Sequence, residues 1–261
     1  MSFGPKIGIV GMGVVGGAIC RSCEFDTPIV NDPALGHNGS YEELCTCDAV
    51  YICVPSPTKS DGTCDTSILE DVLSKLKDAS GVLISKVTAP PDVYERLNKI
   101  YPNLVYSPEF LTAANAMADY RNSTFVIIGG RVNAYVNEAE RIIKADLKNI
   151  KSVITCGIKE AAFIKYTINS FLATKVVFMN EMQQLAKASG IDYAGIARVI
   201  DADARIGKSH LQVPGPDGQY GFGGMCFPKD TQALLKYAES VNIELSVLET
   251  AVKKNTLLRL S

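Results

Sequence analysis

The first half of the chain alternates short apolar segments with segments whose apolar residues recur at helical spacing. Strand-like segments occupy residues 6–10, 28–31, 49–54, 81–85, 104–107, 125–128 and 152–155. Helical periodicity is clearest in residues 67–76, and further helices are expected at 14–23, 92–100 and 133–147. Strands that alternate with helices in this way predict an α/β domain whose doubly wound parallel sheet is covered by helices on both faces.

The pattern changes at residue 158, and the rest of the chain is expected to be all-helical. Residues 161–188 contain neither Gly nor Pro. One helix of about 30 residues would be roughly 45 Å long, which exceeds a compact domain of this size. We therefore expect a partner subunit, most simply in a homodimer, to cover its apolar surface; the alternative is two helices broken near Ser170 or Lys175. Further helices are expected from Asp192, at 228–240 and at 246–260, with a Gly- and Pro-rich loop at 207–227.

Composition narrows the class of protein. The chain has 261 residues, of which 47% are hydrophobic, and a formal net charge of -2, which gives no electrostatic case for nucleic acid or an anionic membrane. No apolar run approaches the roughly 20 residues of a membrane span, and no signal peptide precedes the first strand, so a cytoplasmic protein is expected. The eight cysteines lack the paired CxxC spacing of a zinc site, which favours reduced thiols and no metal.

A glycine-rich segment near the N-terminus fits the G-x-G-x-x-G pattern of a dinucleotide site. Its residues are Gly11, Met12, Gly13, Val14, Val15 and Gly16. It lies between an expected strand and an expected helix, and Asp32 ends the second strand about 20 residues later, as the Rossmann-like arrangement requires. The helix N-terminus would face the phosphates, and Asp32 would accept hydrogen bonds from the adenosine ribose. Because a 2′-phosphate would meet this carboxylate, NAD is expected rather than NADP. We expect a NAD-binding Rossmann domain at residues 1–157 and a helical domain at 158–261.

Two Pro-containing segments follow later strands. One comprises Val54, Pro55, Ser56, Pro57 and Thr58, and the other runs from Lys86 to Pro90 with Thr88 at its centre. Either could be an ordinary turn. Because ligands of doubly wound sheets lie at the carboxyl ends of the strands, we expect both segments to contact the nicotinamide side of the cofactor.

The segment from Gly221 to Asp230 is the strongest candidate for chemistry. Pro228 suits the first position of a helix, which places Cys226 just ahead of a helix N-terminus. The positive end of that helix and nearby Lys229 would favour a thiolate and lower the pKa of the thiol from its usual value of about 8.5. Taken locally, Cys226 could be an activated nucleophile or a buried loop cysteine.

With these segments, the chain resembles the UDP-glucose 6-dehydrogenase family, the UDP-glucose/GDP-mannose dehydrogenases. The matching segments are 11–16, Asp32, 54–58, 86–90, Ser107–Leu111, Lys165–Asn169, Asp203–Gly207 and 221–230. The resemblance implies that NAD accepts two hydrides in succession while a sugar alcohol becomes a carboxylate. Cys226 would bind the aldehyde as a thiohemiacetal, whose oxidation gives a thioester that water cleaves.

The resemblance also implies roles at other matched positions. Lys165 would stabilise an oxyanion and Asn169 would add a neutral donor, because residues four apart share a helix face. Asp230 would assist with water and protons, and Thr88 would help to place water or the nicotinamide. Lys229 is expected near the cofactor. The expected substrate-binding residues are Glu109, which also counts among the catalytic candidates, Phe110, Leu111, Lys165, Asn169, Arg205 (from the other subunit), Gly221, Phe222 and Gly223.

The chain departs from the family pattern in two main ways. Ala113 stands where the family usually has a glutamate that assists thioester hydrolysis. The family's C-terminal UDP-binding domain has no counterpart in these 261 residues. We therefore expect either a short form or a separate polypeptide that completes the site.

Several alternatives stay open. The nearest are a dehydrogenase of another nucleotide sugar, such as GDP-mannose or UDP-N-acetylmannosamine, and a catalytically impaired NAD-binding subunit. A 3-hydroxyacid or 6-phosphogluconate-type dehydrogenase would share the architecture but has no need for the Cys226 loop. The two histidines, His37 and His210, lie outside all of the motifs, which disfavours a 2-hydroxy-acid dehydrogenase with a histidine base.

Overall fold

The computed structural model describes residues 4–25, 27–112 and 114–260, and the chain divides into two compact units. The first comprises Met1–Pro57 and Cys64–Lys165; the second comprises Thr58–Thr63 and Tyr166–Ser261. The sequence pattern changes where helix α7 (Ile158–Ala188) begins, whereas the compact units divide further along that helix.

In the first unit, the described strands form one sheet in the order β3-β2-β1-β4-β5-β6-β7-β8. The strands are β1 (Ile7–Val10), β2 (Ile29–Asp32), β3 (His37–Asn38), β4 (Ala49–Ile52), β5 (Val82–Ser85), β6 (Leu104–Tyr106), β7 (Phe125–Gly129) and β8 (Ser152–Cys156). Strands β2, β1, β4, β5 and β6 pair in parallel, as the alternating pattern predicts.

The predicted doubly wound α/β fold is confirmed, but the sheet departs from parallel pairing toward both edges. Strand β3 pairs antiparallel with β2, and β7 pairs antiparallel with β6 through Tyr106 and Gly129. Strands β7 and β8 are parallel to each other. The chain reverses direction between β6 and β7. The sequence pattern does not predict this reversal, because the periodicity of a strand is the same in either direction. The sheet is therefore mixed, with a Rossmann-like central order.

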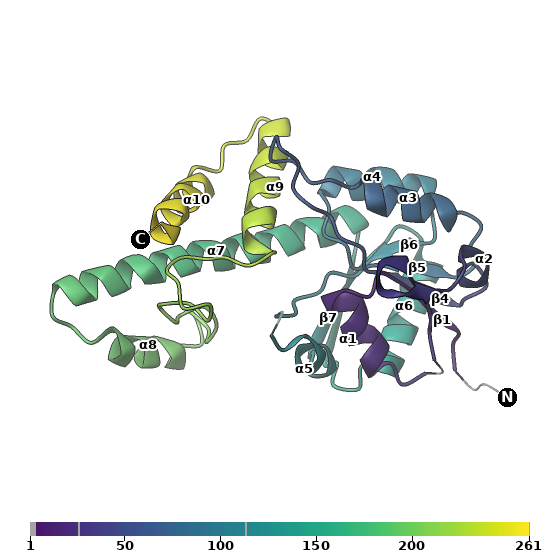
Figure 1. Ribbon diagram of the computed structural model, residues 1–261, viewed down its shortest axis with the longest axis horizontal. Coiled ribbons are helices and arrows are strands. Elements are labelled where there is room, and N and C mark those ends of the chain that lie inside the picture. The colour runs from purple at the N-terminus through teal and green to yellow at the C-terminus, as the bar shows by residue number, and fades with distance from the viewer. Residues whose placement is uncertain (1–3, 26, 113, 261) are drawn as a thin grey trace. The chain divides into compact units, whose positions relative to one another are not determined.

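Helices cover both faces of the sheet (Figure 1). On one face α1 (Val14–Ser22), α5 (Ala116–Arg121) and α6 (Asn133–Asp146) pack against residues such as Ile9, Tyr51 and Ile84. On the other, α2 (Tyr41–Leu44), α3 (Ser67–Lys75), α4 (Pro91–Ile100) and the start of α7 pack against residues such as Ile52 and Leu83. The central strands are buried on both faces, which explains their continuous apolar sequences.

Four short elements had no counterpart in the sequence predictions: the 3-10 helix η1 (Pro33–Leu35), β3, α2 and α5. Each is too short to show a period. Helix α2 nevertheless carries a local signal, a capping box in which Ser40 accepts from the Glu43 N–H and Glu43 accepts from the Ser40 N–H.

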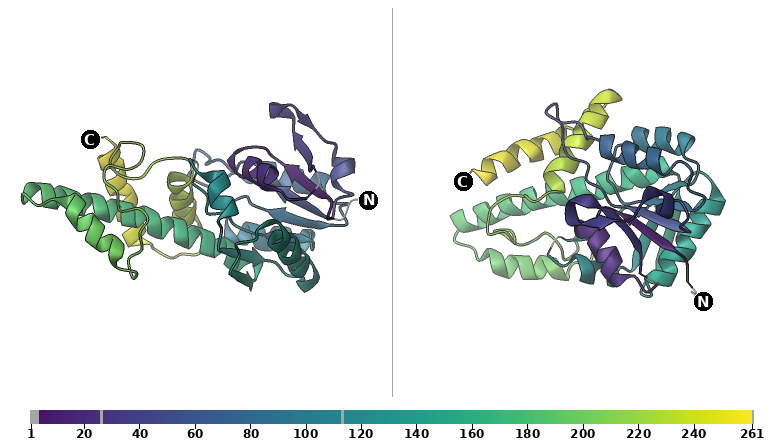
Figure 2. Two further views of the ribbon diagram at one scale, coloured as in Figure 1. Left: turned by 90° about the horizontal axis from the view of Figure 1, so that it is seen from below. Right: turned by 45° about the vertical axis from the view of Figure 1, so that its right-hand side comes forward.

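The second unit is helical and contains most of α7, which is continuous from Ile158 to Ala188 (Figure 2). The alternative of a break near Ser170 or Lys175 is therefore wrong. The other helices are α8 (Tyr193–Ala202), α9 (Phe227–Ser240) and α10 (Ser246–Arg259). A small core joins α7 to α10 and to the loop before α9; its members are Ala173, Val177, Phe222, Ala251 and Leu258.

Within the described residues, no helix combines the length and the hydrophobicity needed to cross a membrane. No disulfide joins the cysteines of the described chain.

Candidate active site

The glycine-rich turn after β1 shows why glycine is needed at two of its positions. Gly11 has φ +91°, a conformation that L side chains rarely adopt. A Cβ on Gly16 would lie 1.9 Å from the Gly11 carbonyl oxygen, so no side chain fits between helix α1 and the turn. The Met12 N–H donates to Asp32 Oδ2 at 2.7 Å. Asp32 therefore fixes the turn from the end of β2.

The turn is open to its surroundings at Gly13. A Cβ on Gly13 would meet no atom within 4 Å, so the position is open rather than filled by the protein. Gly13 is exposed and forms the N-cap of α1, whose first N–H groups have no partner within the helix. An open surface at a helix N-terminus is suited to a phosphate group. The expected residues Val14 and Val15 begin this helix.

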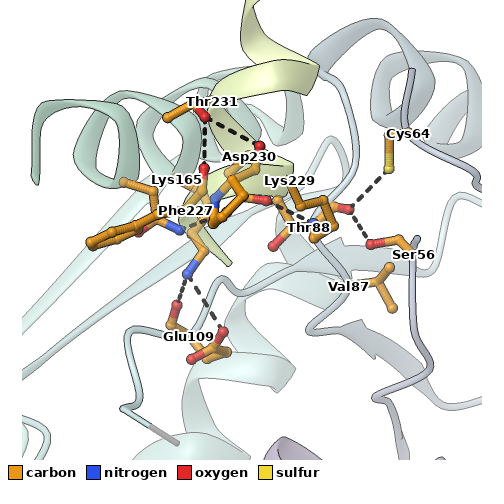
Figure 3. A network of polar contacts seen from close by, with 12 residues as sticks. Ser56, Cys64, Val87, Thr88, Glu109, Lys165, Phe227, Lys229, Asp230 and Thr231 are labelled. Carbon is orange, nitrogen blue, oxygen red and sulfur yellow. Dashed lines mark hydrogen bonds and ion pairs between the residues drawn. The ribbon is translucent and has the colours of Figure 1, made fainter. Parts of the chain in front are cut away.

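The segments after β4 and β5 are joined by a buried hydrogen bond. Ser56 Oγ donates to the Thr88 carbonyl at 2.8 Å, and the thiol of Cys64 lies 3.6 Å from the same oxygen (Figure 3). Ser56 and Thr88 are both buried, whereas Pro55 and Pro57 are exposed. Ser56 therefore links the segment at 54–58 to the segment at 86–90, each of which was expected beside the cofactor. Val54 is partly buried, and Thr58 belongs to the second unit.

Lys165, a buried residue at the end of the first unit, is held by Glu109. Lys165 Nζ donates to the Glu109 carbonyl oxygen, and it lies 3.5 Å from Glu109 Oε1 (Figure 3). It also lies 4.8 Å from the centre of the Phe110 ring. Glu109 Oε2 accepts the Leu111 N–H at 2.6 Å, which keeps the carboxylate in place. The structure thus brings together four of the residues expected to bind substrate, around one ammonium group.

Sequence reasoning missed Lys86 as an individual candidate. This lysine follows β5 directly, is 8% exposed, and donates to Ser107 Oγ at 2.9 Å. Burial lowers the pKa of Lys86 to about 8, and the nearby carboxylate of Glu109 opposes that shift only in part. The available signal was a lysine placed immediately after an entirely apolar strand. Perturbed lysines of this kind are concentrated at functional sites.

In the second unit, the expected nucleophile lies at the start of α9. Cys226 is the N-cap residue, Phe227 is the first helical residue and Pro228 is within the first turn. Cys226 is exposed, so the alternative of a buried loop cysteine is wrong for this unit taken by itself.

A buried carboxylate lies one turn into the same helix. Asp230 is 1% exposed and accepts from Asn169 Nδ2 at 2.6 Å and from Lys229 Nζ at 2.7 Å. Its backbone N–H donates to the Cys226 carbonyl at 2.8 Å. Three expected site residues, Asn169, Lys229 and Asp230, therefore form one polar cluster beside Cys226. Lys229 and Asp230 are drawn in Figure 3.

The remaining expected substrate residues lie in loops of the second unit. Gly221 and Phe222 are buried, and Gly223 lies close to Arg259, since a Cβ at this position would be 2.5 Å from the guanidinium. Arg205 is 89% exposed in its side chain and pairs with Asp203 at 2.6 Å. Ala113 lies outside the described residues.

These features define a class: a Rossmann-type dinucleotide-binding unit followed by a helical unit with a cysteine at a helix N-terminus. Residues 29–147 match the NAD binding domain of the UDP-glucose/GDP-mannose dehydrogenase family, and residues 159–257 match the central domain of the same family. The chain belongs to this family, and its first unit is an NAD-binding domain.

Individual relatives agree with the family match. The chain is 35% identical over 225 residues to a UDP-glucose 6-dehydrogenase of Rickettsia conorii, an alignment that covers 82% of this chain and 50% of the relative. It is 32% identical over 230 residues to that of Pseudomonas aeruginosa, covering 82% and 49%. The chain thus spans about half the length of these relatives.

The fold is also that of a solved structure, a UDP-glucose dehydrogenase from the archaeon Pyrobaculum islandicum. The TM-score is 0.83 at 23% sequence identity, and the match covers 98% of this chain and 69% of the other.

Proposed function

We propose that this chain oxidises UDP-glucose to UDP-glucuronate with NAD, through a covalent intermediate on Cys226. The observation that carries the proposal is the exposed cysteine at the N-terminus of α9, one turn from the buried Asn169–Asp230–Lys229 cluster. A nucleotide-binding fold alone would not need this arrangement. The relatives named UDP-glucose 6-dehydrogenase support the choice of sugar.

The residues of the first unit fit NAD. The turn at residues 11–16 would hold the pyrophosphate, Asp32 would bind the adenosine ribose, and the segments at 54–58 and 86–90 would line the nicotinamide side. When bound there, NAD would supply the hydride acceptor for each oxidation. The carboxylate of Asp32, with no arginine close behind it in the sequence, favours NAD over its 2′-phosphorylated form.

Cys226 provides the nucleophile. Its sulfur adds to the carbonyl carbon of the C6 aldehyde and forms a thiohemiacetal; after the second oxidation, water cleaves the thioester and releases the carboxylate. A helix N-terminus stabilises a thiolate, so the first bond forms at neutral pH.

Lys165 and Asn169 would stabilise the charge on the substrate oxygen. Lys165 is already desolvated and fixed by Glu109, so little reorganisation is needed when an oxyanion develops. Asp230 would orient water and take up a proton. Because Ala113 replaces the usual glutamate, hydrolysis would depend on Lys165, Asp230 and water.

The direct test compares the wild-type chain with Cys226→Ser for NADH formation from UDP-glucose. We expect the substitution to lower the rate of acid formation by at least about a thousandfold, because an alkoxide is far harder to form than a thiolate at pH 7. Equal rates in the two proteins would exclude the covalent mechanism. A panel with GDP-mannose and UDP-N-acetylmannosamine distinguishes the other nucleotide sugars.

A second candidate is a catalytically impaired NAD-binding subunit that pairs with another polypeptide. The alanine at position 113 favours it. NAD binding in calorimetry, with no turnover on any nucleotide sugar and no alkylation of Cys226, would support this candidate against the enzyme.

We also propose that the chain forms a homodimer through α7. Phe171, Phe178 and Leu185 are exposed at 65%, 51% and 61% and recur every seven residues, so they form one stripe along the helix. A stripe of large apolar side chains in water is unfavourable, and a second copy of α7 would cover it symmetrically.

A further inference from the structure

The loop that leads to Cys226 is fixed by two buried asparagines that lie outside the sequence segments matched to the family above. Asn255 lies on α10 and Asn180 on α7; they are 8% and 1% exposed. Asn180 bonds the backbone of Gly221, and Asn255 bonds that of Phe222; these two loop residues precede Cys226 by only a few positions.

Asn255 makes two hydrogen bonds to the backbone of a single residue. Its Oδ1 accepts the Phe222 N–H at 2.6 Å, and its Nδ2 donates to the Phe222 carbonyl at 3.0 Å. A carboxamide can bond both the N–H and the C=O of one residue because it carries a donor and an acceptor side by side. Neither aspartate nor leucine could make both bonds.

Asn180 holds the preceding residue. Its Oδ1 accepts the Gly221 N–H at 3.0 Å, while its Nδ2 donates to the Val176 carbonyl within α7 at 2.8 Å. Gly221 has φ +70°, and a Cβ there would lie 2.4 Å from Asn255 Oδ1. Glycine at this position is therefore what allows the close approach of Asn255.

Apart from Arg259 beside Gly223, the described residues between this anchor and Cys226 have few side chains that could restrain them. Gly223 and Gly224 lack side chains, Gly224 has φ +74°, and Met225 is 86% exposed. By contrast, the Phe222 ring is 5% exposed in the small core with Ala173 and Leu258. The path to Cys226 is thus fixed at residues 221 and 222 and again at the first turn of α9.

We propose that Asn255, with Asn180, is a positioning residue that holds the Cys226 thiol at the N-terminus of α9. Loss of the clamp frees the glycine-rich segment, and the sulfur then spends less time where the helix N–H groups stabilise its thiolate. This inference rests on the proposed role of Cys226 as nucleophile.

The test measures alkylation of Cys226 by iodoacetamide at pH 7, followed by peptide mapping that separates it from the other cysteines. Asn255→Ala should slow this alkylation at least about fivefold, because the sulfur is then held less often at the helix N-terminus, where the reactive thiolate is favoured. Asn180→Ala removes one loop contact instead of two and should have a smaller effect in the same direction. In steady-state oxidation of UDP-glucose, both variants should have a lower kcat, while their KM for NAD should change less than about twofold.

The matched control is Asn98→Ala, which removes another buried asparagine that donates to a backbone carbonyl, that of Leu104 at 2.7 Å. It should lower thermal stability but leave Cys226 alkylation unchanged. Equal alkylation of Cys226 in wild type and in both loop variants would overturn the proposal, as would an equal slowing in Asn98→Ala. Because alkylation requires no sugar, it decides the positioning role even if UDP-glucose is not oxidised.

Discussion

Two glycines of the turn at residues 11–16 differ in what surrounds them, so substitutions at the two positions should have different effects. Gly13 and Gly16 are three positions apart, yet a Cβ at Gly13 meets open space and a Cβ at Gly16 meets the Gly11 carbonyl. Gly13 therefore borders open space, whereas Gly16 leaves room for the Gly11 backbone.

We predict that Gly13→Ala weakens NAD binding by about tenfold or more while leaving the thermal midpoint nearly unchanged, because its methyl group occupies the space of the pyrophosphate. Gly16→Ala should lower the free energy of unfolding by about 3 kcal/mol or more through overpacking. Calorimetric titration with NAD and thermal melts measure the two effects. Unchanged NAD affinity in Gly13→Ala would place the pyrophosphate elsewhere.

Lys86 provides a prediction about pH. Its pKa is about 8 in the folded chain and returns to 10.5 on unfolding, so the unfolded chain binds more protons between these values. Stability from this group therefore rises with pH through the window from 8 to 10.5, and its burial is most unfavourable below pH 8. The total change is about 3 kcal/mol, at 1.36 kcal/mol for each pKa unit.

The measurement is urea denaturation of wild type and Lys86→Met from pH 7 to pH 10.5. The difference in unfolding free energy, wild type minus variant, should increase by about 2–3 kcal/mol across that range. Other titrating groups cancel in the difference. Parallel curves would show that Lys86 keeps an ordinary pKa when folded.

At the scale of elements, α7 has two sets of residues with different tasks. Asn169 and Asn180 are buried and hold polar groups of the second unit, whereas Phe171 and Phe178 are exposed. A single helix can do both because side chains seven apart return to one face while the others point elsewhere.

We predict that Phe178→Asp converts a dimer to a monomer in sedimentation velocity, since it places a charge in the apolar stripe. Gln184→Asp, an exposed position next to Leu185 but off the stripe, is the matched control and should leave the dimer intact. A wild-type chain that sediments as a monomer at high micromolar concentration would refute the proposed interface.

For the whole molecule, the stoichiometry of reduction tests whether one chain contains what the full oxidation needs. Conversion of an alcohol to a carboxylate removes four electrons, so two NADH are expected for each UDP-glucose consumed. The count is obtained from absorbance at 340 nm against sugar measured by chromatography. One NADH for each sugar would mean that the reaction stops at the aldehyde, and Ala113→Glu would then be the first variant to examine.

The fold could be predicted largely from the sequence, because its signals are local. Apolar strands, the period of the helices and the G-x-G-x-x-G turn each depend on residues close in the chain. The continuous helix α7 follows from a segment without Gly or Pro. The reversal of β7 and β8 could not be predicted, because a strand has the same pattern in either direction.

The sequence indicated which residues are candidates for the site, but not which residues hydrogen-bond to one another there. The sequence alone determined which residues could bind a dinucleotide and which thiol precedes a helix, since backbone geometry and helix ends act within a few residues. Only the tertiary structure decided that Glu109 holds Lys165 across 56 positions and that Asn255 holds Phe222 across 33. The lowered pKa of Lys86 likewise follows from its burial in the tertiary structure. Hydrogen bonds and desolvation depend on which groups the fold brings together, and the spacing of residues along the chain does not determine which groups these are.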